Sequence, residues 1–62
     1  MNEIKFVEFL TDLLYNDESG IVRTVGTYED FMVMTHNNGL VVKLGDGSEF
    51  QLTVVQTKEA KE

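Results

Sequence analysis

The fold is decided by residues 31–55, which read FMVMTHNNGLVVKLGDGSEFQLTVV. This stretch holds three runs of β-branched and large apolar residues, which favour strands, and two clusters of Asn, Gly, Asp and Ser, which favour turns. The runs are 31–36, 40–44 and 49–55, and the turn signals are Asn37-Asn38-Gly39 and Gly45-Asp46-Gly47-Ser48. The stretch therefore predicts an antiparallel meander, against which the rest of the chain must pack.

The first turn signal sets the predicted register. Asn38-Gly39 suits a two-residue type I′ turn, which needs positive φ at both central positions. This turn would pair Thr35 with Val42 and Val33 with Leu44. One face would then carry Phe31, Val33, Thr35, Leu40, Val42 and Leu44, and we expect this face to contact the core.

The second turn must differ from the first in length. A two-residue turn there would put the apolar residues of the third run on the wrong face, because a slip of one residue inverts every side chain. We therefore predict a three-residue loop, Gly45-Asp46-Gly47, with Gly47 in the left-handed conformation. The expected cross-strand pairs are Phe50 with Val42 and Leu52 with Leu40.

Residues 3–15 are predicted to form an amphipathic helix. At about 100° per residue, six apolar side chains fall within an arc of roughly 160°. They are Phe6, Val7, Phe9, Leu10, Leu13 and Leu14. Asn2 can cap the start of the helix, and Glu3 favours the positive end of its dipole. We expect the apolar stripe to cover the sheet, with a partner-binding helix as the alternative.

Residues 21–27 have the composition of a further strand, but their poor alternation leaves the inward face unassigned. Gly26 is a candidate for a bulge or bend, and Tyr28-Glu29-Asp30 is expected to form the turn into the next strand. Residues 57–62 are charged, lack apolar anchors and are expected to be frayed. The sequence thus predicts a single α+β domain over residues 1–56, in which an N-terminal amphipathic helix packs on a three- or four-stranded antiparallel β-meander. Whether this sheet stays open or curls into a small barrel is left undecided.

The charge balance bears on partners and location. The 62-residue chain has eleven acidic and five basic side chains, for a formal net charge of −6. This balance disfavours direct binding to nucleic acids and to anionic membranes. No apolar run approaches the ~20 residues of a membrane span, and the first residues lack the pattern of a signal peptide. We therefore expect a cytoplasmic protein without nucleic acid or membrane contacts.

No motif in the chain predicts catalysis. His36 is the single histidine and the chain has no cysteine, so few residues could form a nucleophilic triad. Asp46-Gly47-Ser48-Glu49 lacks the ligand spacing and flanking helices of a calcium loop. Gly45 and Gly47 precede a predicted strand, whereas a phosphate-binding loop must precede a helix. We expect no enzyme activity, no catalytic residue, no cofactor and no metal.

The second face of the predicted sheet is unusually apolar. Among its polar residues it would carry four apolar ones, which are Met32, Met34, Val41 and Val55. If the helix covers the core face, these four side chains form an exposed patch, and such patches often mark interfaces. We predict that this patch binds a protein partner or a second copy of the chain. The alternative is a strongly curled sheet that buries part of both faces.

One segment resembles a known family. Residues 20–34, GIVRTVGTYEDFMVM, resemble the glycine–strand–Asp–strand rhythm of the Sm-like small barrels, with Gly20 near the opening glycine and Asp30 near the acidic position. The strand after Asp30 lacks the usual Asn, and the second Sm segment is missing. The resemblance implies a small-barrel binding module. In size and acidity the chain is also similar to the accessory proteins that phages encode.

The preferred hypothesis is a small acidic non-enzymatic protein-interaction module of the phage-accessory type, which self-associates or binds and modulates a larger host protein. The first alternative is an acidic nucleic-acid mimic that inhibits a DNA- or RNA-binding protein. The second alternative is the Sm-like binding module.

Overall fold

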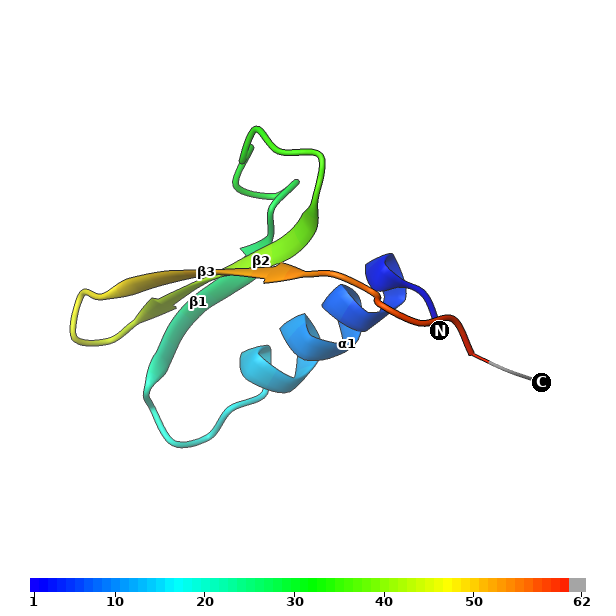
Figure 1. Cartoon of the computed structure of the whole chain (residues 1–62). Helices are drawn as coiled ribbons and strands as arrows, with labels where there is room; N and C mark the ends of the chain where they lie inside the picture. Colours follow the sequence, from blue (N-terminus) through cyan, green and yellow to red (C-terminus); the bar gives the residue numbers. More distant parts are fainter. Residues whose placement is uncertain (61–62) are drawn as a thin grey trace.

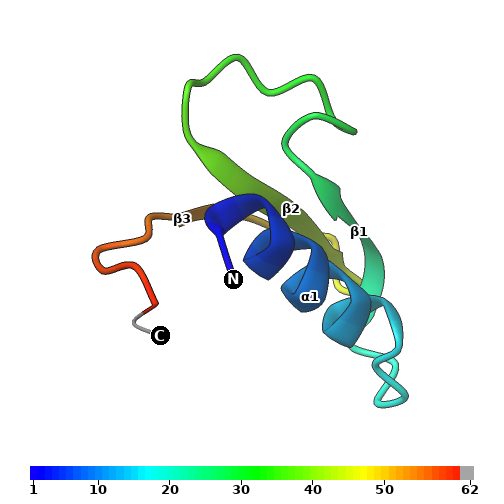
Figure 2. The ribbon, with the colours of Figure 1, turned by 90° about the vertical axis from the view of Figure 1, so that its right-hand side faces the viewer.

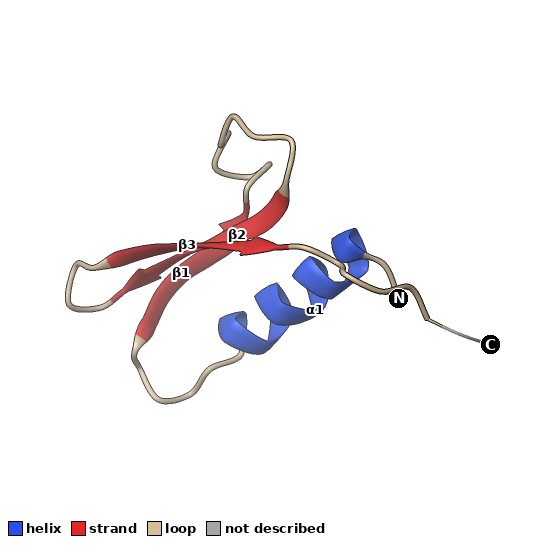
Figure 3. Ribbon diagram, in the orientation of Figure 1, coloured by secondary structure: helices blue, strands red, loops and turns tan. Residues whose placement is uncertain are grey.

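The computed structural model describes residues 1–60 and shows one helix packed on a three-stranded antiparallel sheet (Figures 1 and 3). The elements in chain order are α1 (Glu3–Tyr15), β1 (Val22–Thr27), β2 (Asn38–Leu44) and β3 (Glu49–Val54). The strand order is β1-β2-β3, and α1 lies against one face of the sheet, mainly over β1 and β2 (Figure 2). The predicted α+β arrangement is confirmed, with three strands. Of the charged tail, residues 57–60 lie outside the helix and strands, and residues 61 and 62 lie outside the described residues.

The helix spans the predicted residues 3–15 and is capped at both ends. The Asn2 side chain accepts a hydrogen bond from the Lys5 backbone N–H at 2.9 Å, and Glu3 lies in the first turn. At the other end, the Asn16 backbone N–H donates to the Asp12 carbonyl at 3.0 Å. These contacts satisfy backbone groups that a helix terminus otherwise leaves free.

The β2–β3 hairpin has the predicted three-residue loop. The Leu44 N–H donates to the Ser48 carbonyl at 2.9 Å, and the Gly47 N–H donates to the Leu44 carbonyl at 3.1 Å. Gly47 has φ +94°, the left-handed conformation that this bulged turn needs. The observed pairs include Val42 with Phe50 and Leu40 with Leu52. The register of this hairpin is therefore confirmed.

The predicted hairpin at Asn38-Gly39 is wrong. Both residues begin β2, and residues 31–37 form no strand. The strand that precedes β2 and pairs with it is β1, with Val25 opposite Val42. A side chain at Gly39 would collide with the Tyr28 ring and with the Leu52 carbonyl. The glycine is thus required by a close approach of other groups rather than by a turn.

The segment after β1 is instead closed by a single helical turn. Thr27 Oγ1 accepts from the Asp30 N–H at 3.1 Å, and the Asp30 carboxylate accepts from the Thr27 N–H at 2.9 Å. The Val33 N–H then donates to the Tyr28 carbonyl at 2.9 Å, and Met32 between them has φ +57°. These are a capping box and a Schellman stop. They confirm that the chain turns at residues 28–30. The run that follows, residues 31–36, lies in a loop instead of the predicted strand.

The core lies between α1 and the sheet. Its buried residues are Val7, Leu40 and Val42, and the partly buried side chains around them are Leu10, Leu14, Val22, Val25, Leu44 and Val54. The pairing of β1 with β2 shifts between Val22 and Thr24, so a bulge at Arg23 lets Val22 and Val25 both face the core. This bulge explains the poor alternation of the strand, and it lies three residues before Gly26.

Candidate protein-interaction surface

The structure does not assemble the patch predicted from the sequence. Met32 and Met34 lie in the loop that joins β1 to β2 and are exposed, Met34 to 98%. Val55 follows β3 and is also exposed. Val41, in contrast, is only 1% exposed. The prediction of an exposed Val41 is therefore wrong, and the other three residues do not form a sheet face.

Two aromatic rings explain the burial of Val41. The Phe31 ring lies over Gly26, the residue directly opposite Val41 on β1. The Tyr28 ring lies over Gly39, two residues before Val41 on β2, and its hydroxyl is 2.7 Å from Thr53 Oγ1. The loop from 28 to 37 rises on the side of the sheet opposite α1 (Figure 1) and carries both rings. Phe31, predicted on the core face, thus lies on the other face, where Lys43 Nζ is 5.0 Å from its ring centroid.

A larger apolar surface is exposed on the helix side of the sheet. The buried flank of α1 is formed by Val7 with Leu10 and Leu14. The other flank, formed by Phe6, Phe9 and Leu13, is 38–55% exposed. The stripe predicted from the sequence is therefore only half covered, because α1 packs mainly over β1 and β2 and contacts β3 less.

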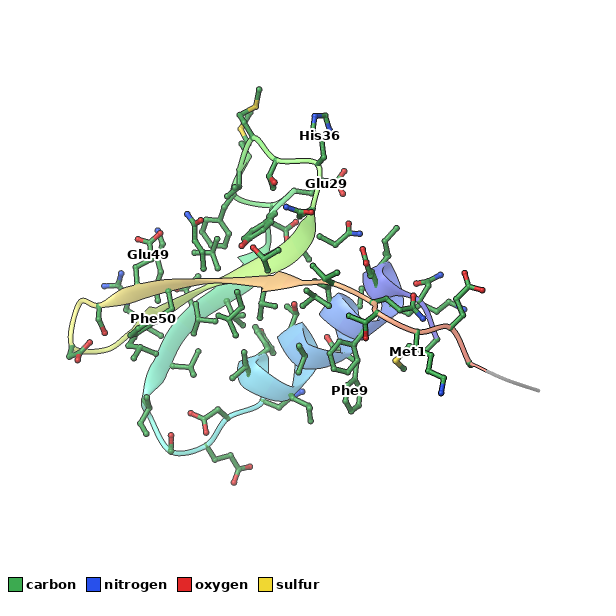
Figure 4. All side chains as sticks on the ribbon, in the orientation of Figure 1. Met1, Phe9, Glu29, His36, Glu49 and Phe50 are labelled. Carbon is green, nitrogen blue, oxygen red and sulfur yellow. The ribbon has the colours of Figure 1, made fainter. Side chains whose placement is uncertain are left out.

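Strand β3 extends this apolar surface. Phe50 and Leu52 are paired with Val42 and Leu40, so they point to the helix side of the sheet, yet both remain about half exposed. Figure 4 shows Phe9 and Phe50 on this same side. We call Phe6, Phe9, Leu13, Phe50 and Leu52 the apolar trough.

The two walls of the apolar trough run antiparallel. The first turn of α1 lies beside the end of β3, since the Glu3 carboxylate accepts from the Gln56 N–H at 2.7 Å. Phe6 and Val54 line a shallow groove of about 210 Å³ at this end. Leu13 lies near the C-terminal end of α1 and Phe50 near the start of β3, each at the far end of its element from this groove. The trough was missed from the sequence because the expected helix position covered the whole sheet.

The carboxylates are engaged in structural contacts at several places. The pKa of Glu3 is lowered by the Gln56 N–H and, second, by the Asn38 side-chain amide, which donates at 2.9 Å. The pKa of Asp46 is lowered by the hydroxyl and N–H of Ser48, which lie in the same turn. Asp46 thus stabilises the β2–β3 loop, as expected of a turn residue.

A polar groove of about 610 Å³ lies between α1 and the loop that follows β1. Glu8, Glu29, Asp30 and His36 are among its lining residues. Within residues 1–60, no group of three or more His, Asp or Glu side chains is placed to hold a metal ion. The groove therefore offers an acidic surface without a recognisable site.

For the part of the chain that the structure describes, no helix has the length and apolar character needed to cross a membrane. Comparisons with models of protein families, with curated proteins and with solved structures found no significant match.

Proposed function

We propose that this chain is a non-enzymatic protein-interaction module that binds through the apolar trough. The observation that carries the proposal is the exposure of three aromatic side chains, Phe6, Phe9 and Phe50, on one side of a 62-residue domain. Monomeric proteins rarely leave large contiguous apolar patches uncovered, and such patches mark interfaces. Aromatic residues are also enriched among the side chains that dominate binding energy.

The energetic argument supports a specific contact. Full burial of a Leu or Phe side chain contributes roughly 1.5–3 kcal/mol. The five residues of the apolar trough are each about half exposed, so covering them would contribute about 1 kcal/mol each. About 5 kcal/mol of gross stabilisation would be gained before the costs of association, which is a substantial share of a protein interface.

The surroundings of the trough fit a protein partner. None of the five residues of the trough is charged. Two acidic residues lie near its ends, because Glu3 lines the groove beside Phe6 and Glu49 begins β3. Met32 and Met34 are proposed as a second, smaller contact, because exposed thioether side chains adapt to irregular surfaces. We place the module in the cytoplasm, as the sequence led us to expect.

The test is capture of a partner from an extract of the native host by the immobilised chain. Phe50→Asp puts a charge in the trough, and Tyr15→Asp puts the same charge on an exposed aromatic position of α1 outside it. We expect a partner that the wild type and Tyr15→Asp retain and that Phe50→Asp loses. Circular dichroism must show that each variant is folded, and Phe9→Asp replaces Phe50→Asp if the latter is not. Equal recovery by all forms would show that the trough is not the binding surface.

A further inference from the structure

We infer that the partner on the trough is a second copy of this chain, joined along the free edge of β3 so that two three-stranded sheets become one continuous sheet. The inference rests on the proposed function and names the partner. The two molecules are related by a two-fold axis, so the same surface is used twice.

The backbone of β3 is free to make this contact. The bond from the Leu44 N–H to the Ser48 carbonyl identifies Leu44–Ser48 as a hydrogen-bonded pair. Such pairs alternate along an antiparallel ladder. The N–H and C=O groups that point to the free edge of β3 are therefore those of Glu49, Gln51 and Thr53. Among residues 1–60 no further strand pairs with this edge.

The two edges of the sheet differ in protection. Natural edge strands are commonly shielded by bulges, by charged side chains or by proline. The edge strand β1 has both a bulge and a charged, exposed residue at Arg23. β3 is regularly paired throughout, contains no proline, and has its single charge at its first residue, Glu49. Intermolecular strand pairing is therefore hindered at the β1 edge and unhindered at the β3 edge.

The side chains of β3 are self-complementary in one register. If Gln51 pairs with Gln51 of the second copy, Phe50 of each protomer faces Leu52 of the other. Both pairs then lie on the helix side, between the two copies of Phe6 and Leu13. Glu49 faces Thr53, and the two Glu49 carboxylates are separated by four residues along the strand, about 13 Å. This exceeds the Debye length of about 10 Å at 0.1 M salt, so repulsion between the two Glu49 carboxylates is largely screened.

The exposed area also favours a second copy. The chain exposes 5076 Å², whereas a compact monomer of 7.0 kDa is expected to expose about 4,000 Å². The loop after β1 and the C-terminal segment contribute to this excess of about 1,000 Å², and so does the trough. A standard interface buries about 800 Å² on each partner. The excess is therefore of the same order as the area that one symmetric dimer contact buries on each chain.

The absence of cysteine makes the register testable by cross-linking. In a hydrogen-bonded antiparallel pair the Cα atoms are about 5.5 Å apart, within the range of a disulfide. We expect Gln51→Cys to form a disulfide-linked dimer under mild oxidation. Thr24→Cys, on the equally accessible β1 edge, should remain a free thiol. Cross-linking at Thr24 in place of Gln51, or at neither position, would overturn the inference.

Proline provides a second test in solution. The Gln51 N–H points away from β2, so Gln51→Pro leaves the ladder within the chain intact and removes the central intermolecular bonds. Sedimentation should give the wild type twice the 7.0 kDa mass of the chain. Loss of the two symmetry-related bonds should raise the dimer dissociation constant about 30-fold. If the proline variant does not fold, the cysteine pair decides.

The outcomes separate this inference from the proposed function. A wild-type chain that stays monomeric at every concentration overturns the dimer, while loss of a captured host protein by Phe50→Asp would still support the trough as a binding surface. A dimer that forms equally well with Gln51→Pro overturns the β3 contact in particular.

Discussion

Tyr28→Ala is expected to remove much of the stability of the fold. The Tyr28 side chain is only 6% exposed, covers Gly39 and places its hydroxyl 2.7 Å from Thr53 Oγ1. Truncation of a buried aromatic residue to Ala costs roughly 3–5 kcal/mol. A 62-residue domain has a total stability of about 3–9 kcal/mol, at roughly 0.05–0.15 kcal/mol per residue. The variant should therefore be marginally folded or unfolded.

Two companion variants divide this effect into its parts. Tyr28→Phe keeps the ring over Gly39 and loses only the hydroxyl contact, so its cost should be about 1 kcal/mol. Tyr15→Ala is the matched control, because Tyr15 is 77% exposed at the end of α1. Its effect should stay within about 0.5 kcal/mol.

Urea unfolding followed by far-ultraviolet circular dichroism gives these free energies of unfolding. All variants must be measured at one protein concentration, because self-association would make the apparent stability depend on concentration. If Tyr28→Ala is no more harmful than Tyr15→Ala, then Tyr28 does not anchor the loop on the sheet. That result would instead fit a solvent-exposed turn residue.

Further predictions concern the backbone and one carboxylate. Met32→Gly should raise the free energy of unfolding by about 0.5 kcal/mol, because relief of the left-handed conformation exceeds the entropy cost of glycine; Met34→Gly, assayed by the same urea titration, should give no gain. Gly47→Ala should lower the thermal midpoint by about 5 °C through its positive φ, and Gly45→Ala, where the added methyl would meet only ordinary contacts, should lower it less in the same thermal scan. Glu3 has a lowered pKa when folded, so the stability it contributes is present above its ordinary value of 4.5 and is lost as the pH falls through the folded-state value. Urea titrations at a series of pH values should therefore show a weaker loss of stability on acidification for Glu3→Gln than for the wild type; equal losses would contradict the assignment.

The parts of the fold that follow from local patterns could be predicted from the sequence. The period of the apolar residues located α1, and its cap at Asn2 fixed the start. The second hairpin followed from parity, because only an odd loop keeps Phe50 on the face of Val42. In both cases neighbouring residues carry the information, and the tertiary structure does not override them.

The first hairpin failed because a stronger local signal was overlooked. Thr27-Tyr-Glu-Asp30 has the spacing of a capping box, which could have predicted the helical turn after β1. The close packing at Gly39 could not be predicted from neighbouring residues, because it depends on the Tyr28 ring, which is eleven residues away in the sequence. Asn-Gly pairs are strong turn signals, but a glycine also permits close packing in a strand.

The apolar trough depends on a quantity that no local pattern contains. The helix stripe and the apolar residues of β3 were both identified in the sequence, and either could have covered the other. The helix stripe and the apolar residues of β3 do not cover each other because α1 lies over β1 and β2. On that side the bulge at Arg23 lets Val22 and Val25 both pack against the core. The exposed surface is thus a result of tertiary packing.

The contacts of Gln56 have a practical consequence for experiments. Its N–H binds Glu3 and its side-chain amide donates to the Met1 carbonyl at 3.2 Å, so residues far apart in the chain meet at one end of the sheet. That end is the one where Phe6, a residue of the trough, and Val54 line the shallow groove. A purification tag fused before Met1 or shortly after Gln56 would therefore emerge beside the surface under study and could shield it. Tags at either end are therefore best removed by proteolysis before association is measured.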